Sequence, residues 1–247
     1  MDNRSISAND LQTHQKDFTA KVKVDQTPYS RPSMLIKWKL LENIMRPLKS
    51  SDPRTGQGTK WYVGWDGTSL RIAFAPLLLN PGTNPGEYDI LESDRFELVE
   101  QGQLWILKQI TDWSTRWKGN KDAYVDRYYQ VTTIDRENKG FVNLDPLKDP
   151  CASIIAWDWA LEEMFKQNSQ PGDDPELLEL KVIHGASWAN GGDGGLMGFR
   201  HLLCFNICYN SIDRLEQSKE DPTRPYFNRG ANYAQPCPAL CTTYVVR

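Results

Sequence analysis

The sequence has few of the features that mark membrane, secreted or nucleic-acid-binding proteins. No stretch approaches the roughly 18 to 20 consecutive apolar residues that a membrane-spanning helix needs. The first part of the chain has several aspartates and no apolar run, so we expect no secretory signal. The formal net charge is only −3, which does not favour a nucleic-acid partner. We therefore expect a soluble intracellular protein with no membrane and no specific nucleic acid among its partners.

Histidine and cysteine are also scarce, with three and five residues respectively. An odd number of cysteines in an intracellular chain favours reduced thiols. His184 and Ser187 stand close together, but the Gly-x-Ser-x-Gly turn of many hydrolases is absent. The carboxylates of Asp158, Glu162 and Glu163 are expected on the solvated face of a helix. The sequence thus predicts no catalytic residue and no enzyme.

Aromatic residues, by contrast, are abundant, and the nine Trp and ten Tyr favour β-rich packing. Turn residues divide much of the chain into pairs of apolar segments, the pattern of a β-hairpin. The three pairs are 60–65 with 68–74 around Asp66-Gly67, 96–100 with 103–110 around Gln101-Gly102, and 124–134 with 141–144 around residues 137–140. Three successive hairpins predict an antiparallel sheet or sandwich.

Other segments carry helical signals. Ser7, followed three residues later by an acid, caps a predicted helix that runs to about Val22. A second helix is predicted after Asp149-Pro150, with Ile154, Trp157, Leu161, Met164 and Phe165 on one face. A third is predicted from 199 to about 215, with a broad apolar arc of Leu202, Phe205, Tyr209, Ile212 and Leu215. Residues 34–41 predict a strand or short helix, and 177–183 a strand.

These patterns predict an α+β fold, mainly β, with an antiparallel β-sandwich core, an N-terminal helical arm and flanking helices. Residues 1–247 form a single domain with an arm at 1–22, a core at 23–218 and an irregular tail at 219–247. Only Leu11, Phe18 and Val22 form the apolar stripe of the arm, too narrow to hold it firmly on its own domain. We expect the arm either to fray or to pack on another subunit.

Two C-terminal patterns suggest ligand sites. Five glycines fall within residues 187–198, ahead of the predicted helix at 199, but the spacing fits neither a Walker loop nor a dinucleotide fingerprint. Asp193 alone does not make a calcium loop, so we interpret the segment as a connector. His201, Cys204 and Cys208 share one helical arc, and two further thiols follow, Cys237 and Cys241. Core packing is favoured over zinc or a disulfide because that arc is apolar. No metal or cofactor is expected, and the role of the cysteines stays open.

The carboxyl end also carries a likeness to a known family. A glycine-containing loop leads into a predicted Cys-bearing aromatic helix at 196–217, and a tail that contains Pro and Tyr follows at 222–233. With the polar N-terminal helix, the β core and the total length, this arrangement resembles the polyhedrins of cypoviruses. The resemblance implies a structural viral protein that crystallises in the cytoplasm of infected cells as occlusion bodies and embeds virus particles.

The resemblance also implies how such crystals form and dissolve. Homotrimers would be the building blocks, with the N-terminal helix joining trimer to trimer through Leu11, Phe18 and Val22. The partners would be the chain itself and virus particles. The crystals would dissolve at alkaline pH, where the ten Tyr and the Lys side chains titrate together. Members of the family bind nucleotides, but no motif for one is found here.

Two other functions compete with this interpretation. A carbohydrate-binding module or lectin would use aromatic rings in a β-sandwich to stack on sugars. Trp61, Trp65, Trp113 and Trp117 are the candidates for that role, although core packing explains most of them. A hydrolase with a site assembled from distant acids is the third alternative, and no local pattern supports it.

Overall fold

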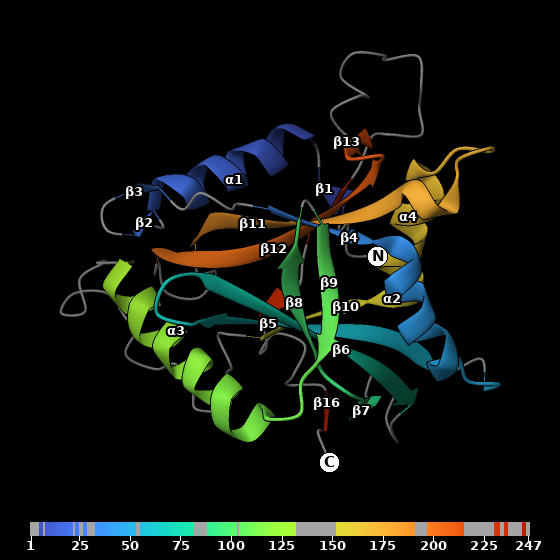
Figure 1. Cartoon of the computed structure of the whole chain (residues 1–247), viewed down its shortest axis with the longest axis horizontal. Helices are drawn as coiled ribbons and strands as arrows, with labels where there is room; N and C mark the ends of the chain where they lie inside the picture. Colours follow the sequence, from blue (N-terminus) through green and yellow to red (C-terminus); the bar gives the residue numbers. More distant parts are fainter. Residues whose placement is uncertain are drawn as a thin grey trace.

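A computed structural model shows a mixed α/β protein built mainly of strands (Figure 1). The residues that it describes are 5–6, 8–21, 23–24, 27–28, 33–52, 55–81, 88–102, 104–131, 152–190, 197–214, 230–232, 235–236 and 244–245. No helix in these ranges is long and apolar enough to cross a membrane.

One large sheet contains nearly all the strands. Its main strands are β4 (Ser33–Lys37), β5 (Gly56–Trp65), β6 (Leu70–Pro81), β8 (Phe96–Gln101), β9 (Leu104–Gln109), β10 (Ala152–Ala156), β11 (Leu178–Asn190) and β12 (Met197–Tyr209). Shorter strands are β1 (Ser5–Ile6), β7 (Tyr88–Glu92), β13 (Ile212–Asp213), β14 (Gly230–Asn232), β15 (Gln235–Pro236) and β16 (Tyr244–Val245). A separate pair is formed by β2 (Lys23–Val24) and β3 (Thr27–Pro28).

Helical segments surround the sheet. The α-helices are α1 (Ala8–Lys21), α2 (Trp38–Met45), α3 (Lys118–Val131) and α4 (Glu162–Asn168). The 3-10 turns are η1 (Arg46–Leu48) and η5 (Pro175–Leu177), and the π-helical turns are η2 (Trp113–Trp117) and η4 (Trp157–Leu161). α1 lies along β11 on one side of the molecule, and α3 lies against β5 on the other (Figure 1).

The main strands follow the order β12-β11-β4-β9-β8-β6-β5-β10 and pair antiparallel, except for the parallel pair β4–β9. Strands that lie far apart in this order meet through their side chains, which shows that the sheet curls strongly. The ring of Trp61 on β5 lies 5.0 Å from that of Phe74 on β6 and 5.1 Å from that of Phe205 on β12. The result is a half-barrel whose inner face holds one aromatic and aliphatic core. The predicted two-sheet sandwich is not confirmed, since these strands share a single sheet.

A smaller apolar cluster lies on the outer face of β5 and β6. Side chains alternate along a strand, so Trp61 and Val63 face the inner core while Tyr62 and Gly64 face outward. Gly64 allows the helix α3 to approach closely: a Cβ there would lie 3.0 Å from Cβ of Asn120. Trp117, in the turn before α3, fills the space over the small residues of β6.

Several sequence predictions are confirmed. The N-terminal helix, the hairpins at 60–74 and 96–110, and the strand at 177–183 all form, and residues 34–41 contain a strand followed by a helix. The first hairpin closes with Trp65 opposite Leu70, and the second with Gln101 opposite Leu104. Gly67 and Gly102 both have positive φ, at 100° and 65°, which explains why glycine follows the turn-forming polar residue at both places.

The predicted helix at 199–215 is wrong. This segment is the strand β12, which pairs along its whole length with β11, from Met197 opposite Asn190 to Tyr209 opposite Leu178. Residues 203–208 are all buried, because β12 is covered on both faces. A strand buried on both faces shows no alternation, and its periodicity cannot be distinguished from that of a buried helix.

Two more predictions need correction. Residues 124–131, expected to be a strand, belong to the helix α3. The helix expected after Asp149-Pro150 is preceded by β10, which pairs with β5 before the chain turns helical at Trp157. Consecutive β-branched residues, Ile154 and Ile155, favour the extended conformation here. The partner segment 141–144, the glycines 191–195 and most of the tail lie outside the described residues.

Candidate functional site

The residues expected to make assembly contacts, Leu11 and Phe18, are buried in the chain's own fold. The ring of Phe18 stacks on the imidazole of His184 at 5.1 Å and 15°. Beneath the helix, a Cβ on Gly185 would lie 3.1 Å from Cβ of His14. The absence of that Cβ lets α1 lie directly on β11, so a freely projecting helical arm is not confirmed. Val22 is outside the described residues.

Burial sets the protonation of two groups under α1. Desolvation lowers the pKa of His184 to about 3, so its imidazole is neutral at physiological pH. Desolvation raises the pKa of the Cys204 thiol to about 12, so this sulfur is not a nucleophilic thiolate there. Neither group has the properties of a catalytic base or nucleophile at neutral pH.

The helical arc considered for a zinc site at His201, Cys204 and Cys208 is absent, because these residues lie on the strand β12. Cys204 and Cys208 are both buried on β12. The side chain of His201, together with Cys237 and Cys241, lies outside the described residues. Among the side chains that the structure describes, no group of three or more His, Cys, Asp and Glu could hold a metal ion.

The carboxylates of the 157–168 segment make local structural contacts. Asp158 Oδ2 accepts a hydrogen bond from the backbone N–H of Gln57 at 3.4 Å, and this bond ties the π-helical turn to β5. Glu162 Oε1 accepts one from Nε1 of Trp157 at 3.0 Å, and Glu163 accepts one from Gln167. Glu163 is exposed, as the solvated-face interpretation expects, whereas Asp158 and Glu162 are half-buried and hold the turns in place.

The four tryptophans proposed for sugar stacking are mostly inaccessible. Trp61, Trp65 and Trp117 are buried. Trp113 is half-buried, and its ring stacks on Trp117 at 5.3 Å while the guanidinium of Arg95 lies 4.3 Å from its centroid. A sugar would have to compete with these neighbours for the ring of Trp113.

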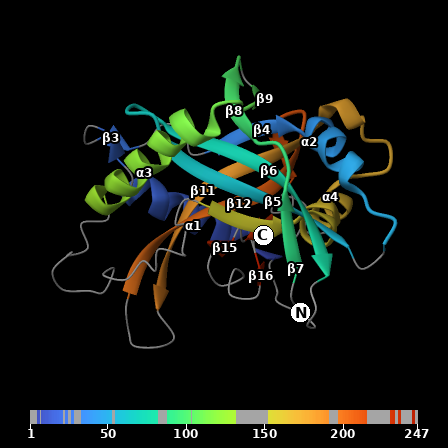
Figure 2. The same cartoon turned by 90° about the horizontal axis from the view of Figure 1, so that it is seen from below.

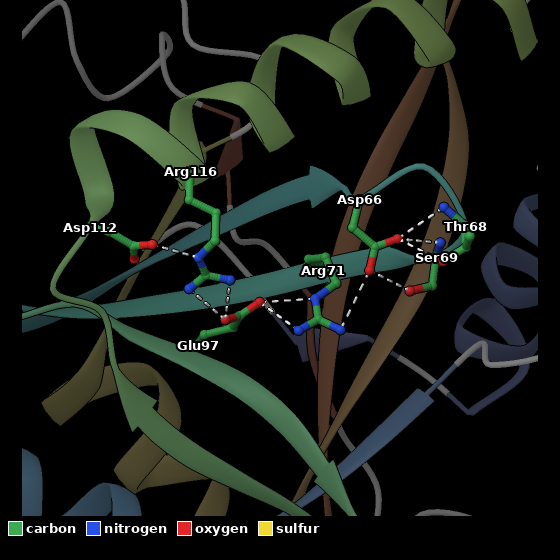
Figure 3. A network of polar contacts seen from close by, with 7 residues as sticks. All are labelled: Asp66, Thr68, Ser69, Arg71, Glu97, Asp112 and Arg116. Atoms are coloured by element: carbon green, nitrogen blue, oxygen red, sulfur yellow. Dashed lines mark hydrogen bonds and ion pairs between the residues drawn. The ribbon is translucent and has the colours of Figure 1, made fainter.

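The most developed polar cluster surrounds Glu97 (Figure 3). The Glu97 side chain is 3% exposed, and its two oxygens bind different guanidinium groups. Oε1 accepts from Nε of Arg71 at 2.9 Å, and Oε2 accepts from both terminal nitrogens of Arg116 at 3.1 Å. Asp112 binds Nε of Arg116 at 2.9 Å, and Asp66 lies 3.6 Å from Arg71.

This cluster occupies the point where β8 separates from β6. β8 pairs with β6 only at Phe96 and Glu97, and beyond them the two strands diverge. The Glu97 carboxylate with its two guanidiniums fills that fork and joins β6, β8 and the turn η2. Sequence reasoning missed this cluster, since its residues lie far apart in the chain. The local signal is a charged residue, Glu97, between the apolar residues Phe96 and Leu98.

Two carboxylates of the cluster are held in the ionised form. Burial acts to raise the pKa of Asp66, but hydrogen bonds from the N–H and hydroxyl groups of Thr68 and Ser69 outweigh it and lower that pKa. The hydrogen bond from Arg116 lowers the pKa of Asp112. Asp66 and Asp112 therefore keep their negative charge near neutral pH.

Lysines hold two other buried carboxylates at the β11–β13 end of the sheet. Glu179 is 1% exposed and binds Nζ of Lys37 at 2.9 Å and the N–H of Ser211 at 2.8 Å. Asp213 is 8% exposed and binds Nζ of Lys181 at 2.7 Å. The two lysine side chains are themselves largely covered.

Comparisons with known proteins give no match: no protein-family profile, curated protein or solved structure matches this chain. Function must therefore be inferred from the described arrangement itself. Among the described residues, that arrangement consists of ion pairs in which arginines and lysines bind carboxylates on neighbouring strands and turns.

Proposed function

We propose that the protein is a structural protein that assembles with copies of itself into crystals inside the cell, as occlusion bodies that embed and protect virus particles. The proposal takes the cytoplasm of an infected cell as the place of assembly and a homotrimer as the building block. Its sequence basis is the polyhedrin-like arrangement of the chain. The proposal also includes two features that the structure of the single chain does not confirm, a β-sandwich core and a projecting helical arm.

The observation that carries the proposal is the dependence of buried carboxylates on lysine. Glu179 forms an ion pair with Lys37, and Asp213 forms one with Lys181. Lysine ammonium groups generally lose their proton at about pH 10 to 11, whereas guanidinium groups keep theirs. A buried carboxylate without its cation is strongly destabilising. Alkaline pH would therefore loosen this end of the sheet, as a crystal that dissolves in alkali requires.

The helix α1 is the proposed link between building blocks. Leu11 and Phe18 are the apolar residues that such a link would use, together with Val22. Within one chain, Leu11 and Phe18 pack inward. A link through these residues requires α1 to pack on β11 of a neighbouring copy in place of its own. Such an exchange would preserve the contact of Phe18 with a His184 side chain.

Expression in insect cells tests the proposal. We expect micrometre-sized crystals that persist in neutral buffer and dissolve near pH 11, a range set by lysine and tyrosine titration at about pH 10 to 11. A chain that stays monomeric and soluble at high concentration, with or without its first 22 residues, would contradict it.

The alternative is a carbohydrate-binding module. It rests on Trp113 alone, because the other three tryptophans considered are buried. Retention of the protein on a polysaccharide column, abolished by Trp113→Ala, would favour this alternative over assembly.

A further inference from the structure

An amine and an amide lie next to each other on the paired strands β11 and β12, which run side by side (Figure 2). Lys181 on β11 stands directly opposite Asn206 on β12. Residues that are opposite each other in an antiparallel pair have their side chains on the same face of the sheet. The side chains of Lys181 and Asn206 are therefore neighbours across the pair.

A tight turn brings a carboxylate to the same place. The two residues of the turn at 210–211 have positive φ, at 51° and 65°, and β13 folds back onto β12 so that Asp213 stands opposite Cys208. Cys208 is two residues from Asn206 and shares its face. Oδ2 of Asp213 accepts a hydrogen bond from Nζ of Lys181 at 2.7 Å, and Oδ1 accepts one from Nδ2 of Asn206. One carboxylate thus bridges the amine and the amide.

The carbonyl group of the Asn206 side chain has a donor of its own. Its Oδ1 accepts a hydrogen bond from the backbone N–H of Ile207 at 2.8 Å. An N–H in this position polarises the carbonyl and stabilises negative charge that develops on the oxygen, as an oxyanion-hole donor does in acyl transfer. The amide is therefore held at both ends, its oxygen by a donor and its nitrogen by a carboxylate.

The cluster is largely removed from water. Asn206 is fully buried, Asp213 is 8% exposed, and the side chain of Lys181 is 20% exposed. Burial penalises separated charges, so the transfer of a proton from ammonium to carboxylate costs less here than at a protein surface. A lysine amine that has lost its proton is a nucleophile toward carbonyl carbon.

We propose that Lys181 and Asn206 join in a covalent amide bond, which the folded chain forms by itself with Asp213 as the proton carrier. The Lys181 ammonium passes one proton to the carboxylate, and the neutral Nζ attacks Cγ of Asn206. The bond from Cγ to Nδ2 then breaks. Asp213 gives its proton to the leaving nitrogen and takes another from Nζ, so that one ammonia leaves and Asp213 ends as a neutral carboxyl group.

The bond would close residues 181–206 into a covalent loop. A cross-link of this kind restricts the unfolded chain and so stabilises the folded one. It lies within one chain, so the inference does not depend on the proposed function. A chain that carries the bond has no Lys181 ammonium, and its alkaline sensitivity then rests on Lys37 and Glu179.

Mass spectrometry of the full-length purified protein, under denaturing conditions, tests the proposal. The intact mass should be lower than that of the sequence by one ammonia. Digestion with trypsin should give the peptides 167–200 and 201–214 joined together and uncleaved after Lys181, because trypsin does not cut after an acylated lysine. A cyclic imide at an asparagine also loses ammonia, but it joins no peptides and opens in mild alkali. A wild-type protein in which these peptides are separate would overturn the proposal and leave the proposed function untouched.

Lys181→Arg should abolish both the loss of ammonia and the joined peptides, because a guanidinium can pair with Asp213 but keeps its proton and does not attack the amide. Asp213→Asn should abolish them as well, since the proton carrier is removed. Lys37→Arg is the matched control: Lys37 pairs with Glu179 on the same face of the sheet, and the cross-link should form as in the wild type.

Circular dichroism checks that each variant is folded. Joined peptides at the wild-type yield in folded Asp213→Asn protein would show that Asp213 does not carry the proton. If that variant does not fold, Lys181→Arg and Lys37→Arg decide the proposal, because both keep the charge of the original pair. Loss of the cross-link in Lys37→Arg as well as in Lys181→Arg would contradict the assignment of Lys181 as the nucleophile.

Discussion

His184 shows how one buried side chain makes stability depend on pH. Burial lowers its pKa to about 3, while an unfolded histidine titrates near about 6.5. Between these values the unfolded chain binds a proton that the folded chain excludes. Folding stability therefore falls as pH decreases from about 6.5 toward 3, at about 1.4 kcal/mol per pH unit.

His184→Phe should remove this part of the acid sensitivity while keeping a ring for Phe18 to stack on. The check is the difference in unfolding free energy between pH 7 and pH 4.5, measured by urea denaturation for both proteins. We expect a smaller difference in the variant. Equal differences would show that His184 is protonated in the folded protein at pH 4.5.

Glu97 is the residue on which the fork between β6 and β8 depends. Glu97→Gln keeps the shape of the side chain but leaves Arg71 and Arg116 without their shared anion. Both guanidiniums retain partial contact with water, which limits the loss to about 2 kcal/mol of unfolding free energy. Asp122→Asn is the control, since its pair with Lys118 is exposed and should contribute less than about 0.5 kcal/mol. Chemical denaturation of the two variants and the wild type measures both losses of unfolding free energy.

At the scale of elements, the position of α1 depends on one missing methyl group. Gly185→Ala would place a Cβ 3.1 Å from Cβ of His14 and 3.3 Å from Sγ of Cys204, and the first of these atoms can move only with the helix backbone. We expect faster amide hydrogen exchange across residues 8–21 and a decrease in unfolding free energy of about 1 to 2 kcal/mol.

Gly119→Ala provides the comparison, because no atom lies within 4 Å of a Cβ at that helical position. It should be neutral or stabilising, by up to about 1 kcal/mol. Unchanged amide hydrogen exchange in α1 of the Gly185→Ala protein would mean that α1 does not pack on β11 at Gly185 as described.

Elements with a local cause were predictable from the sequence, and elements with a distant cause were not. The hairpins around Asp66 and Gln101 follow from turn residues that act within a few positions. β12 was mistaken for a helix because cover on both faces removes the alternation that marks a strand. The polar cluster at Glu97 joins β6, β8 and η2, and nothing in one segment indicates the others.

At the scale of the whole molecule, the buried carboxylates fall into two classes by the chemistry of their cations. Arginines hold Glu97 at one fork of the sheet, and Arg214, next to β13, holds the buried carboxylate of Asp173. Lysines hold Glu179 and Asp213 at the β11–β13 end. Because guanidinium stays charged in alkali and ammonium does not, the two kinds of ion pair should respond differently when the pH rises. Alkaline unfolding should begin at the two lysine-held pairs.

The double variant Lys37→Arg, Lys181→Arg tests this difference. Arginine would keep its charge above pH 11, so the carboxylates of Glu179 and Asp213 would remain compensated. The midpoint of alkaline unfolding, followed by far-ultraviolet circular dichroism, should rise by on the order of one pH unit. Lys39→Arg is the control: its pair with Glu176 is exposed on both sides, so its midpoint should stay at the wild-type value. A double variant that unfolds at the wild-type pH would place the alkaline sensitivity elsewhere, with the tyrosines as the next groups to test.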